Sequence, residues 1–495
     1  MHEVETGTER NRWVALVVLC AGFLMIILDQ TIVNVALPSI QSDLGFSQSS
    51  LAWVVNAYLI AFGGLLLLAG RLGDLLGRRR IFLIGLAVFT AASLLCGVAQ
   101  SQEVLIGARF LQGLGGALTA AVILGMIVTM FPEPRDRAKA IGVYSFVAAA
   151  GASIGLLAGG VLTEAINWHW IFFVNLPIGV ATAVLALRLI DGDEGIGFGR
   201  GADILGAVLV TGALMLTVYT IVKASDYGWG ATHTLGFGAA SVALLAAFLA
   251  RESRAANPLI PLGIFRGRNV SGANLVQALM VAGLFGMFFL GSLYLQRVLG
   301  YGPVEIGLAF LPVALAIGAF SLGLSARLNT RFGAKATLIP GLALVVAGLA
   351  WFARAPVNGE YLTDLFPAMV LLGIGAGMAF PSLMTLAMSS ATESDSGLAS
   401  GLVNTTQQVG GALGLAVLAT LSTTRTDSLL AAGDAAPSAL TSGYQLAFVI
   451  ATGLVLAAIG IAVTVLRPDS TPAEEEEPAE VGFPGGEPAY YEEAA

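Results

Sequence analysis

The sequence predicts an all-α integral membrane protein made of two six-helix bundles, which a parallel repeat relates, and two helices inserted between them. The first observation is composition: 56% of the 495 residues are apolar and 11% are charged, whereas about 25% of a soluble protein is charged. The second is a series of fourteen apolar runs. The third is an internal repeat of glycine and basic residues.

The composition excludes several classes of protein. So few charges cannot cover a surface that faces water, which excludes a soluble enzyme, and a net charge of -8 argues against a nucleic-acid partner. Cys20 and Cys96 both lie in apolar runs, and the three histidines are scattered through the chain. The sequence has neither a zinc-protease motif nor a nucleotide-binding P-loop. We therefore expect no enzyme activity, no metal and no cofactor.

The fourteen runs each have the length of a membrane span, since a bilayer core of about 30 Å requires about 20 helical residues. They cover 13–37, 51–70, 81–99, 104–130, 138–162, 170–190, 204–223, 234–250, 270–296, 303–326, 336–354, 364–389, 396–422 and 443–466. An even number of spans puts both termini on one side. Nineteen Lys and Arg residues lie on that side and four on the other. The positive-inside rule then predicts cytoplasmic termini in the plasma membrane.

The repeat divides the chain into two halves. Basic and glycine residues of one half align at constant spacing with those of the other: Arg71, Gly77, Arg79 and Gly85 with Arg327, Gly333, Lys335 and Gly341. Two extra spans between the halves keep both in the same orientation, as in transporters with parallel repeats. The predicted segments are a cytoplasmic N-terminus (1–12), a first bundle (13–190), a linker with two inserted helices (191–268), a second bundle (269–466) and a disordered acidic tail (467–495).

Asp29 and Arg109 are the clearest charged residues deep in the predicted spans. Asp29 lies nine residues from Pro38, about 13 Å along a helix, where a charge costs about 3 kcal/mol or more. Burial favours the neutral carboxyl and a nearby cation favours the carboxylate, so Asp29 can act as a proton switch. Arg109 lies at similar depth, and Gln112 shares its helix face. The alternatives are a structural hydrogen bond for Asp29 and a permanent ion pair for both.

The predicted cytoplasmic loop 70–80 combines glycines, arginines and a single acid. Such a loop satisfies the positive-inside rule without any further function. Asp74 is nevertheless unusual in a basic loop, and Thr330 occupies its place in the second half. The residues of interest are Gly70, Arg71, Gly73, Asp74, Gly77, Arg78 and Arg79.

Small and polar residues of the spans indicate two further surfaces. Gly151, Gly155, Gly159 and Gly160 form a stripe that suits close helix packing. Other residues could line a central cavity or, where aromatic, anchor span ends in the membrane interface. These are Asn34, Trp53, Tyr58, Asn274, Gln277, Phe285, Phe288, Tyr294, Asn404 and Gln408.

At these residues the chain resembles the fourteen-span drug:proton antiporters of the major facilitator superfamily. The motifs are Leu28–Pro38 in the first span, Gly70–Arg80, Arg109 with Leu111–Gly116, Trp168–Gly179, Tyr294–Gln296 with Pro303 and Pro312, and Asn404–Gly414. The resemblance covers about residues 13 to 466. It implies that Asp29 and Arg109 couple protons to transport, that Asp74 and its arginines latch a cytoplasmic gate, and that proton influx drives efflux.

Two residues depart from the family pattern. The antiporter motif of the fifth span has Gly-Pro where this chain has Gly155 and Leu156, and His169 stands where the family often has Arg. An importer, an exporter of a particular metabolite or envelope lipid, and a receptor without transport therefore stay open. We expect a monomer in lipid that uses the proton gradient and carries a small amphipathic, drug-like molecule, as multidrug efflux and antibiotic-resistance proteins do.

Overall fold

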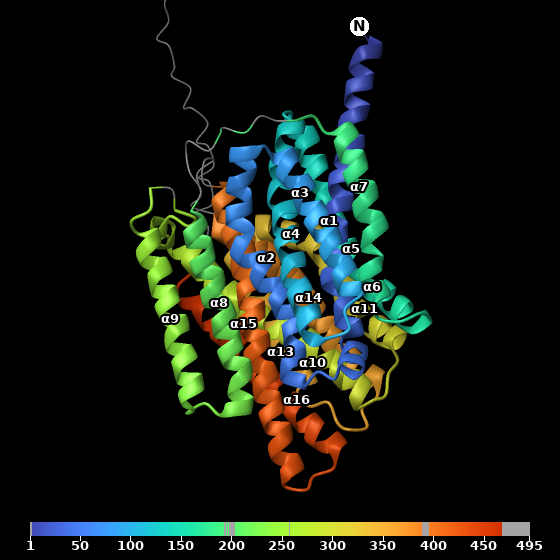
Figure 1. Ribbon diagram of the computed structural model, residues 1–495, viewed down its shortest axis with the longest axis vertical. Coiled ribbons are helices and arrows are strands. Elements are labelled where there is room, and N and C mark those ends of the chain that lie inside the picture. Colours follow the sequence, from blue (N-terminus) through green and yellow to red (C-terminus); the bar gives the residue numbers. More distant parts are fainter. Residues whose placement is uncertain are drawn as a thin grey trace, which may run out of the picture.

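The computed structural model describes residues 2–192, 195, 197, 203–256, 258–388 and 396–467. In these residues the regular structure is helical (Figure 1), which confirms the all-α prediction. The first half and the inserted pair contain α1 (His2–Leu44), α2 (Gln48–Leu76), α3 (Arg78–Gly97), α4 (Gln102–Met130), α5 (Pro134–Ala165), α6 (Trp170–Phe173), α7 (Asn175–Leu189), α8 (Ile204–Tyr227) and α9 (Thr232–Glu252).

The second half follows a short 3-10 helix, η2 (Leu262–Arg266). It contains α10 (Arg268–Arg297), α11 (Pro303–Ala319), η3 (Phe320–Leu324), α12 (Ser325–Phe332), α13 (Ala334–Phe352), η4 (Tyr361–Leu365), α14 (Phe366–Met388), α15 (Ser396–Ala431) and α16 (Ala436–Thr464). Every one of the fourteen predicted runs coincides with helix. Eleven helices of the described residues are long and apolar enough to cross a membrane, and 303–319 is a shorter apolar helix. The tail 468–495 lies outside the described residues, and helix α1 already begins at His2.

The two ends of the bundle are distinguished by their turns. The upper end in Figure 1 is the end where α1 begins, and it holds Gly77 (φ 96°) and Gly333 (φ 86°). The lower end holds the turns at Gly45, Gly228 and Gly433, also with positive φ. Glycine adopts this backbone conformation without the steric cost that a Cβ imposes.

The repeat is visible in how equivalent helices pack. A Cβ on Gly85 of α3 would lie 2.9 Å from the carbonyl oxygen of Gly115 on α4, and one on Gly341 of α13 would lie 3.0 Å from that of Gly375 on α14. Each pair of backbones can approach only because both residues lack a side chain.

Equivalent basic residues also bond the last helix of each half. Arg79 donates to the carbonyl oxygen of Leu187 in α7 (2.6 Å), and Lys335 donates to those of Val463 (2.9 Å) and Leu466 (2.6 Å) at the end of α16. The final carbonyls of a helix have no partner within the helix and carry its negative partial charge. The same device thus fixes the last helix of both halves.

The halves are joined along two helix pairs, α2 with α15 and α5 with α11. At the lower end, Gln48 of α2 donates to Ser422 of α15 (3.1 Å), and Glu164 of α5 accepts from the backbone amide of Val304 in α11 (3.1 Å). Hydrogen bonds therefore connect the two halves at that end on both sides of the molecule.

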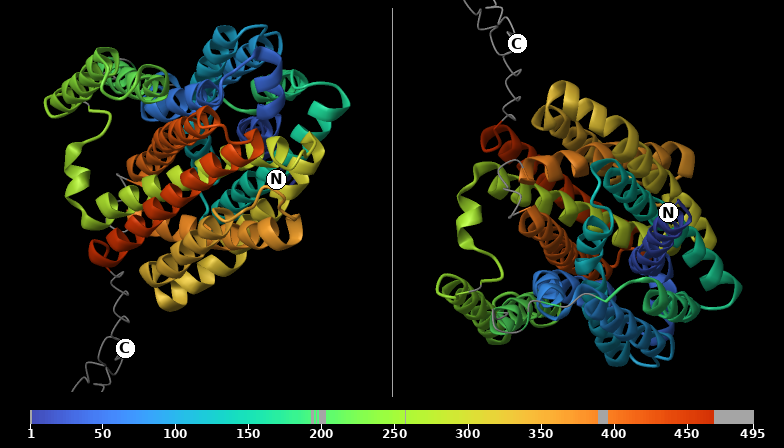
Figure 2. Two further views of the ribbon diagram at one scale, coloured as in Figure 1. Left: turned by 90° about the horizontal axis from the view of Figure 1, so that it is seen from below. Right: turned by 90° about the horizontal axis from the view of Figure 1, so that it is seen from above.

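Helices α8 and α9 lie at the periphery of the molecule (Figure 2). Helix α8 packs on α2 and α15, and α9 packs on α8. Thr420 of α15 donates to the carbonyl oxygen of Ile221 in α8 (3.3 Å), and Arg251 at the end of α9 bonds Asp203 at the start of α8 (3.1 Å). The inserted pair thus covers the outside of one junction between the halves.

The glycine stripe of α5 contacts two helices. Gly151, Gly155 and Gly159 face α1, and Gly160 faces α11 across the junction between the halves. A Cβ on Gly159 would lie 2.7 Å from the carbonyl oxygen of Ile32, and one on Gly160 would lie 2.7 Å from that of Pro303. Neither backbone can give way cheaply.

Gly159→Ala should lower the thermal stability of the detergent-solubilised protein, because overpacking a tight contact costs about 1–3 kcal/mol. The matched control is Gly453→Ala in α16, where a Cβ meets no heavy atom within 4 Å. Melting followed by size-exclusion chromatography measures the difference. Equal melting temperatures for the two variants would show that the α1–α5 contact does not require glycine.

Candidate functional site

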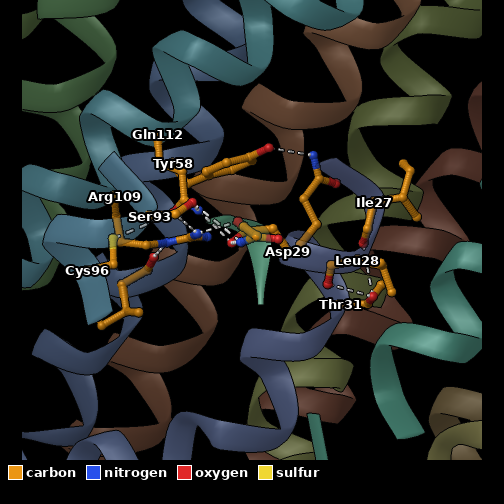
Figure 3. A network of polar contacts seen from close by, with 12 residues as sticks. Ile27, Leu28, Asp29, Thr31, Tyr58, Ser93, Cys96, Arg109 and Gln112 are labelled. Atoms are coloured by element: carbon orange, nitrogen blue, oxygen red, sulfur yellow. Dashed lines mark hydrogen bonds and ion pairs between the residues drawn. The ribbon is translucent and has the colours of Figure 1, made fainter. Parts of the chain in front are cut away.

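A network of polar side chains is enclosed within the first half (Figure 3). Arg109 of α4 donates to Asp29 of α1 (2.5 Å) and to the side-chain oxygen of Gln112 (2.7 Å), and Gln112 donates to the other oxygen of Asp29 (2.6 Å). Asp29 and Gln112 are 0% exposed and Arg109 is 1% exposed. The structure therefore brings together the three residues predicted for proton coupling.

Two residues that sequence reasoning did not assign complete the network. Asn175, at the start of α7, donates to Asp29 (3.1 Å), and Ser93 of α3 accepts from Gln112 (2.8 Å). Both side chains are fully buried. In the sequence, each of these two residues is a polar residue inside an apolar run. Many residues with a purely structural role show the same pattern, so the pattern alone does not identify a functional residue.

The guanidinium of Arg109 has further partners on neighbouring helices. Its Nε donates to the carbonyl oxygen of Val54 in α2 (2.9 Å), and its Cζ lies 4.4 Å from the ring centre of Tyr58 and 5.8 Å from that of Phe172. Aromatic faces attract cations, most strongly where water is excluded. The charge is thus distributed over an acid, an amide, a backbone carbonyl and two rings.

This arrangement can hold a proton or release it. Three donors fix the charged form of the carboxylate, while complete burial favours the neutral form. Because the two effects oppose each other, the loss of a donor favours the neutral carboxyl. The described residues contain no group of three side chains suited to a metal ion.

A corresponding region of the second half is packed with apolar residues. Leu349 of α13 stands opposite Ser93 at the spacing that aligns Arg71 with Arg327. It packs against Gly283 of α10, where an added Cβ would also meet Val455 and Ala451.

Asp74 and Arg78 of the loop at residues 70–80 bond other residues of the first half. Asp74 pairs with Arg78 one helical turn away (3.2 Å), and Arg78 also donates to the carbonyl oxygen of Gly125 in α4 (2.9 Å). A Cβ on Gly73 would press on Val122, whereas one on Gly70 would meet no heavy atom within 4 Å. A contact from Asp74 to the second half stays a prediction.

The residues predicted for a central cavity occupy different environments. Tyr58 belongs to the polar network, and Tyr294 is buried in the second half, where its hydroxyl donates to the carbonyl oxygen of Pro356 (2.6 Å). Neither lines an open surface. Phe285 packs on Gly411, and the ring of Phe288 contacts that of Phe310 in a tilted arrangement.

The remaining candidates lie in α1, α2, α10 and α15. Asn34 bonds within its own helix, Trp53 is half-buried and Asn404 is exposed. Gln277 donates to Gln407 of α15 (3.5 Å), and Gln408 lies against Gly63 of α2. Side-chain oxygens of Asn274, Gln277 and Gln408 are buried and have no hydrogen-bond partner.

Arg109→Gln should destabilise the protein strongly, because removing one partner of a buried ion pair costs about 3–5 kcal/mol. Asp29 is then left to lose its charge or remain unpaired. The double variant Asp29→Asn with Arg109→Gln should recover part of the loss in thermal stability. A double variant that melts below Arg109→Gln alone would show that the two residues stabilise the fold independently.

Comparison with known proteins gives the family. A model of the Major Facilitator Superfamily matches residues 19–415. The chain is 41% identical to the puromycin resistance protein pur8 of Streptomyces alboniger over 475 residues. This alignment covers 95% of this chain and 94% of that protein. It is 38% identical to the cephamycin export protein CmcT of Amycolatopsis lactamdurans over 456 residues, 92% of this chain and 91% of that protein.

The fold also resembles a solved transporter. A bacterial homologue of the human lysosomal transporter Spinster, in an inward-facing and unoccupied conformation, superposes with a TM-score of 0.65 at 17% identity, over 91% of this chain and 96% of that one. At this identity the likeness concerns the fold alone. Together with the family match, it shows that the chain belongs to the Major Facilitator Superfamily and is a membrane transporter, not an enzyme.

Proposed function

We propose that the protein exports small amphipathic antibiotics from the cytoplasm in exchange for protons. The observation that carries the proposal is the buried network of Asp29, Arg109 and Gln112 in the first half. Relatives whose names state puromycin resistance and cephamycin export support the substrate class. We expect the chain to cross the plasma membrane fourteen times, with the end of the molecule that is uppermost in Figure 1 facing the cytoplasm.

Protonation of Asp29 would change the contact between the two halves, and helix α2 would transmit this change. A neutral Asp29 holds Arg109 less strongly, and Arg109 is bonded to the backbone of α2 at Val54 and covered by Tyr58 of the same helix. The opposite face of α2 meets α15 at Gln48 and Gly63. A change in the position of Arg109 therefore alters the surface on which the two halves turn, and the proton shifts the balance between their two arrangements.

The substrate surface that we propose contains amides and aromatic rings and no charge. Buried oxygens of Asn274, Gln277 and Gln408 lack partners, and an unpaired buried acceptor gains free energy when a donor reaches it. Hydroxyl, amide and amine groups of an antibiotic could supply such donors. Leu156 replaces the proline of the antiporter motif, so import is the alternative to export. A measurement of the direction of transport decides between the two.

Asp29→Asn should insert and fold normally but lose proton-coupled export, because an amide keeps the shape of the side chain and cannot accept the proton. Puromycin uptake into inverted vesicles with an imposed pH gradient measures the loss, which should reach the level of vesicles without the protein. Asp434→Asn, at an exposed loop, is the matched control. Full uphill uptake by Asp29→Asn would leave Asp29 with a structural role only.

Asp74→Asn should increase the inward-open population and slow turnover, with little effect on expression. The reason is that Asp74 is the only acid of the basic loop, sited where the halves must separate for inward opening. A partly wet Asp–Arg contact is worth about 1 kcal/mol or less, and such a change alters a two-state population severalfold.

Distances between spin labels at the upper ends of the two halves measure these populations. Asp136→Asn, which changes another exposed acid at the same end, is the control. If the label distances in Asp74→Asn match those in the unaltered protein, the loop serves only to set topology.

A further inference from the structure

A cavity opens at the lower end of the first half, apart from the junction between the halves. Its volume is about 490 Å³. It lies between the end of α1, the turn after α3, and the segment that contains α6. Its lining includes Asp43, Gly97, Asn167, His169 and Phe173.

Asp43 and His169 are the titratable side chains that line this cavity. Nε2 of His169 lies 3.9 Å from a carboxylate oxygen of Asp43, which also accepts from the indole of Trp168 (2.9 Å). Trp168 and His169 stack at 3.7 Å, and the buried Nδ1 of His169 has no hydrogen-bond partner. A histidine and a carboxylate in contact can pass a proton from water to a neighbouring acceptor.

Two lining residues of the cavity are next in sequence to residues that contact the polar network of Asp29. Gly97 directly follows Cys96, whose thiol lies 3.6 Å from the side-chain oxygen of Gln112. Phe173 directly follows Phe172, whose ring faces Arg109. The end of α3 and the single turn of α6 therefore lie between the cavity and the network.

Phe173 packs on Gly97 in the wall of the cavity. A Cβ on Gly97 would lie 2.8 Å from the tip of its ring, so the ring fills the space that the glycine leaves free. The side chain of Phe173 is half-buried. Displacing this ring would open the space beside Gly97.

The junction between the halves offers a different environment. At the lower end it is bonded through Gln48 and Ser422 on one side and through Glu164 and Val304 on the other. Asp29 is 0% exposed. In this conformation solvent therefore does not reach Asp29 through the junction.

We infer that this cavity is the port through which protons of the outer solution reach Asp29, separate from the path of the substrate. The inference rests on the proposed function. A hydronium ion in the cavity gives its proton to His169 or Asp43, and water behind the displaced Phe173 carries it to the carboxylate of Asp29. One water molecule is left and no other bond changes.

The test closes the cavity with a removable group. Asn167→Cys places a thiol at an exposed lining position, and the two native cysteines are buried. A bulky, membrane-impermeant methanethiosulfonate reagent is attached from outside in proteoliposomes whose lower face points outward. Ala432→Cys, at another exposed loop of the lower end, is labelled identically as the control.

The readout is the infrared carbonyl band of protonated Asp29 after an acid pulse in the outer solution, identified by its loss in Asp29→Asn. Labelled Asn167→Cys should lose the fast phase of band formation and regain it when a reductant removes the label, while labelled Ala432→Cys keeps it. A fast phase that survives in labelled Asn167→Cys would overturn the inference and leave the proposed function intact. If the unlabelled protein shows no band that depends on Asp29, then proton coupling at Asp29 fails and the port fails with it.

Discussion

The ion pair between Asp29 and Arg109 is the interaction around which the helices of the first half are arranged. Charges at this depth are costly, and their cost is offset by bonds from α1, α3, α4 and α7 and by the backbone of α2. Five helices thus contribute to one buried network. Its position within one half, and not between the halves, separates the proposed proton site from the proposed substrate surface, and in our proposal α2 connects them.

The repeat explains how one half could specialise. Both halves keep the glycines that let paired helices touch and the basic residue that bonds the last helix. The polar network lies in the first half, whereas the surroundings of Gly283 and Leu349 in the second half are apolar. The amides of the proposed substrate surface lie on α10 and α15 of the second half, and buried amide atoms without partners also occur in the first half, at Gln41, Asn56 and Asn175. We propose a division in which one half handles the proton and the other recognises the substrate.

Much of the fold could be predicted from sequence because lipid allows few solutions: apolar runs of span length must be helices. The pairing of Asp29 with Arg109 and Gln112 could be predicted because buried charges are rare and must find partners. Asn175 and Ser93 escaped prediction because a polar residue in a span is common and only the three-dimensional packing shows where it points. Tyr58 and Tyr294 were assigned to a cavity for the same reason, since periodicity does not tell a ring over a guanidinium from one on an open surface.

The most direct test of the account measures proton movement driven by substrate alone. Purified protein in proteoliposomes is given a puromycin gradient without a pH gradient, and a trapped pH-sensitive dye follows the lumen. Exchange through Asp29 predicts that protons move opposite to puromycin and that Asp29→Asn abolishes both fluxes. Puromycin movement without any proton movement, or a proton flux that persists in Asp29→Asn, would contradict the account.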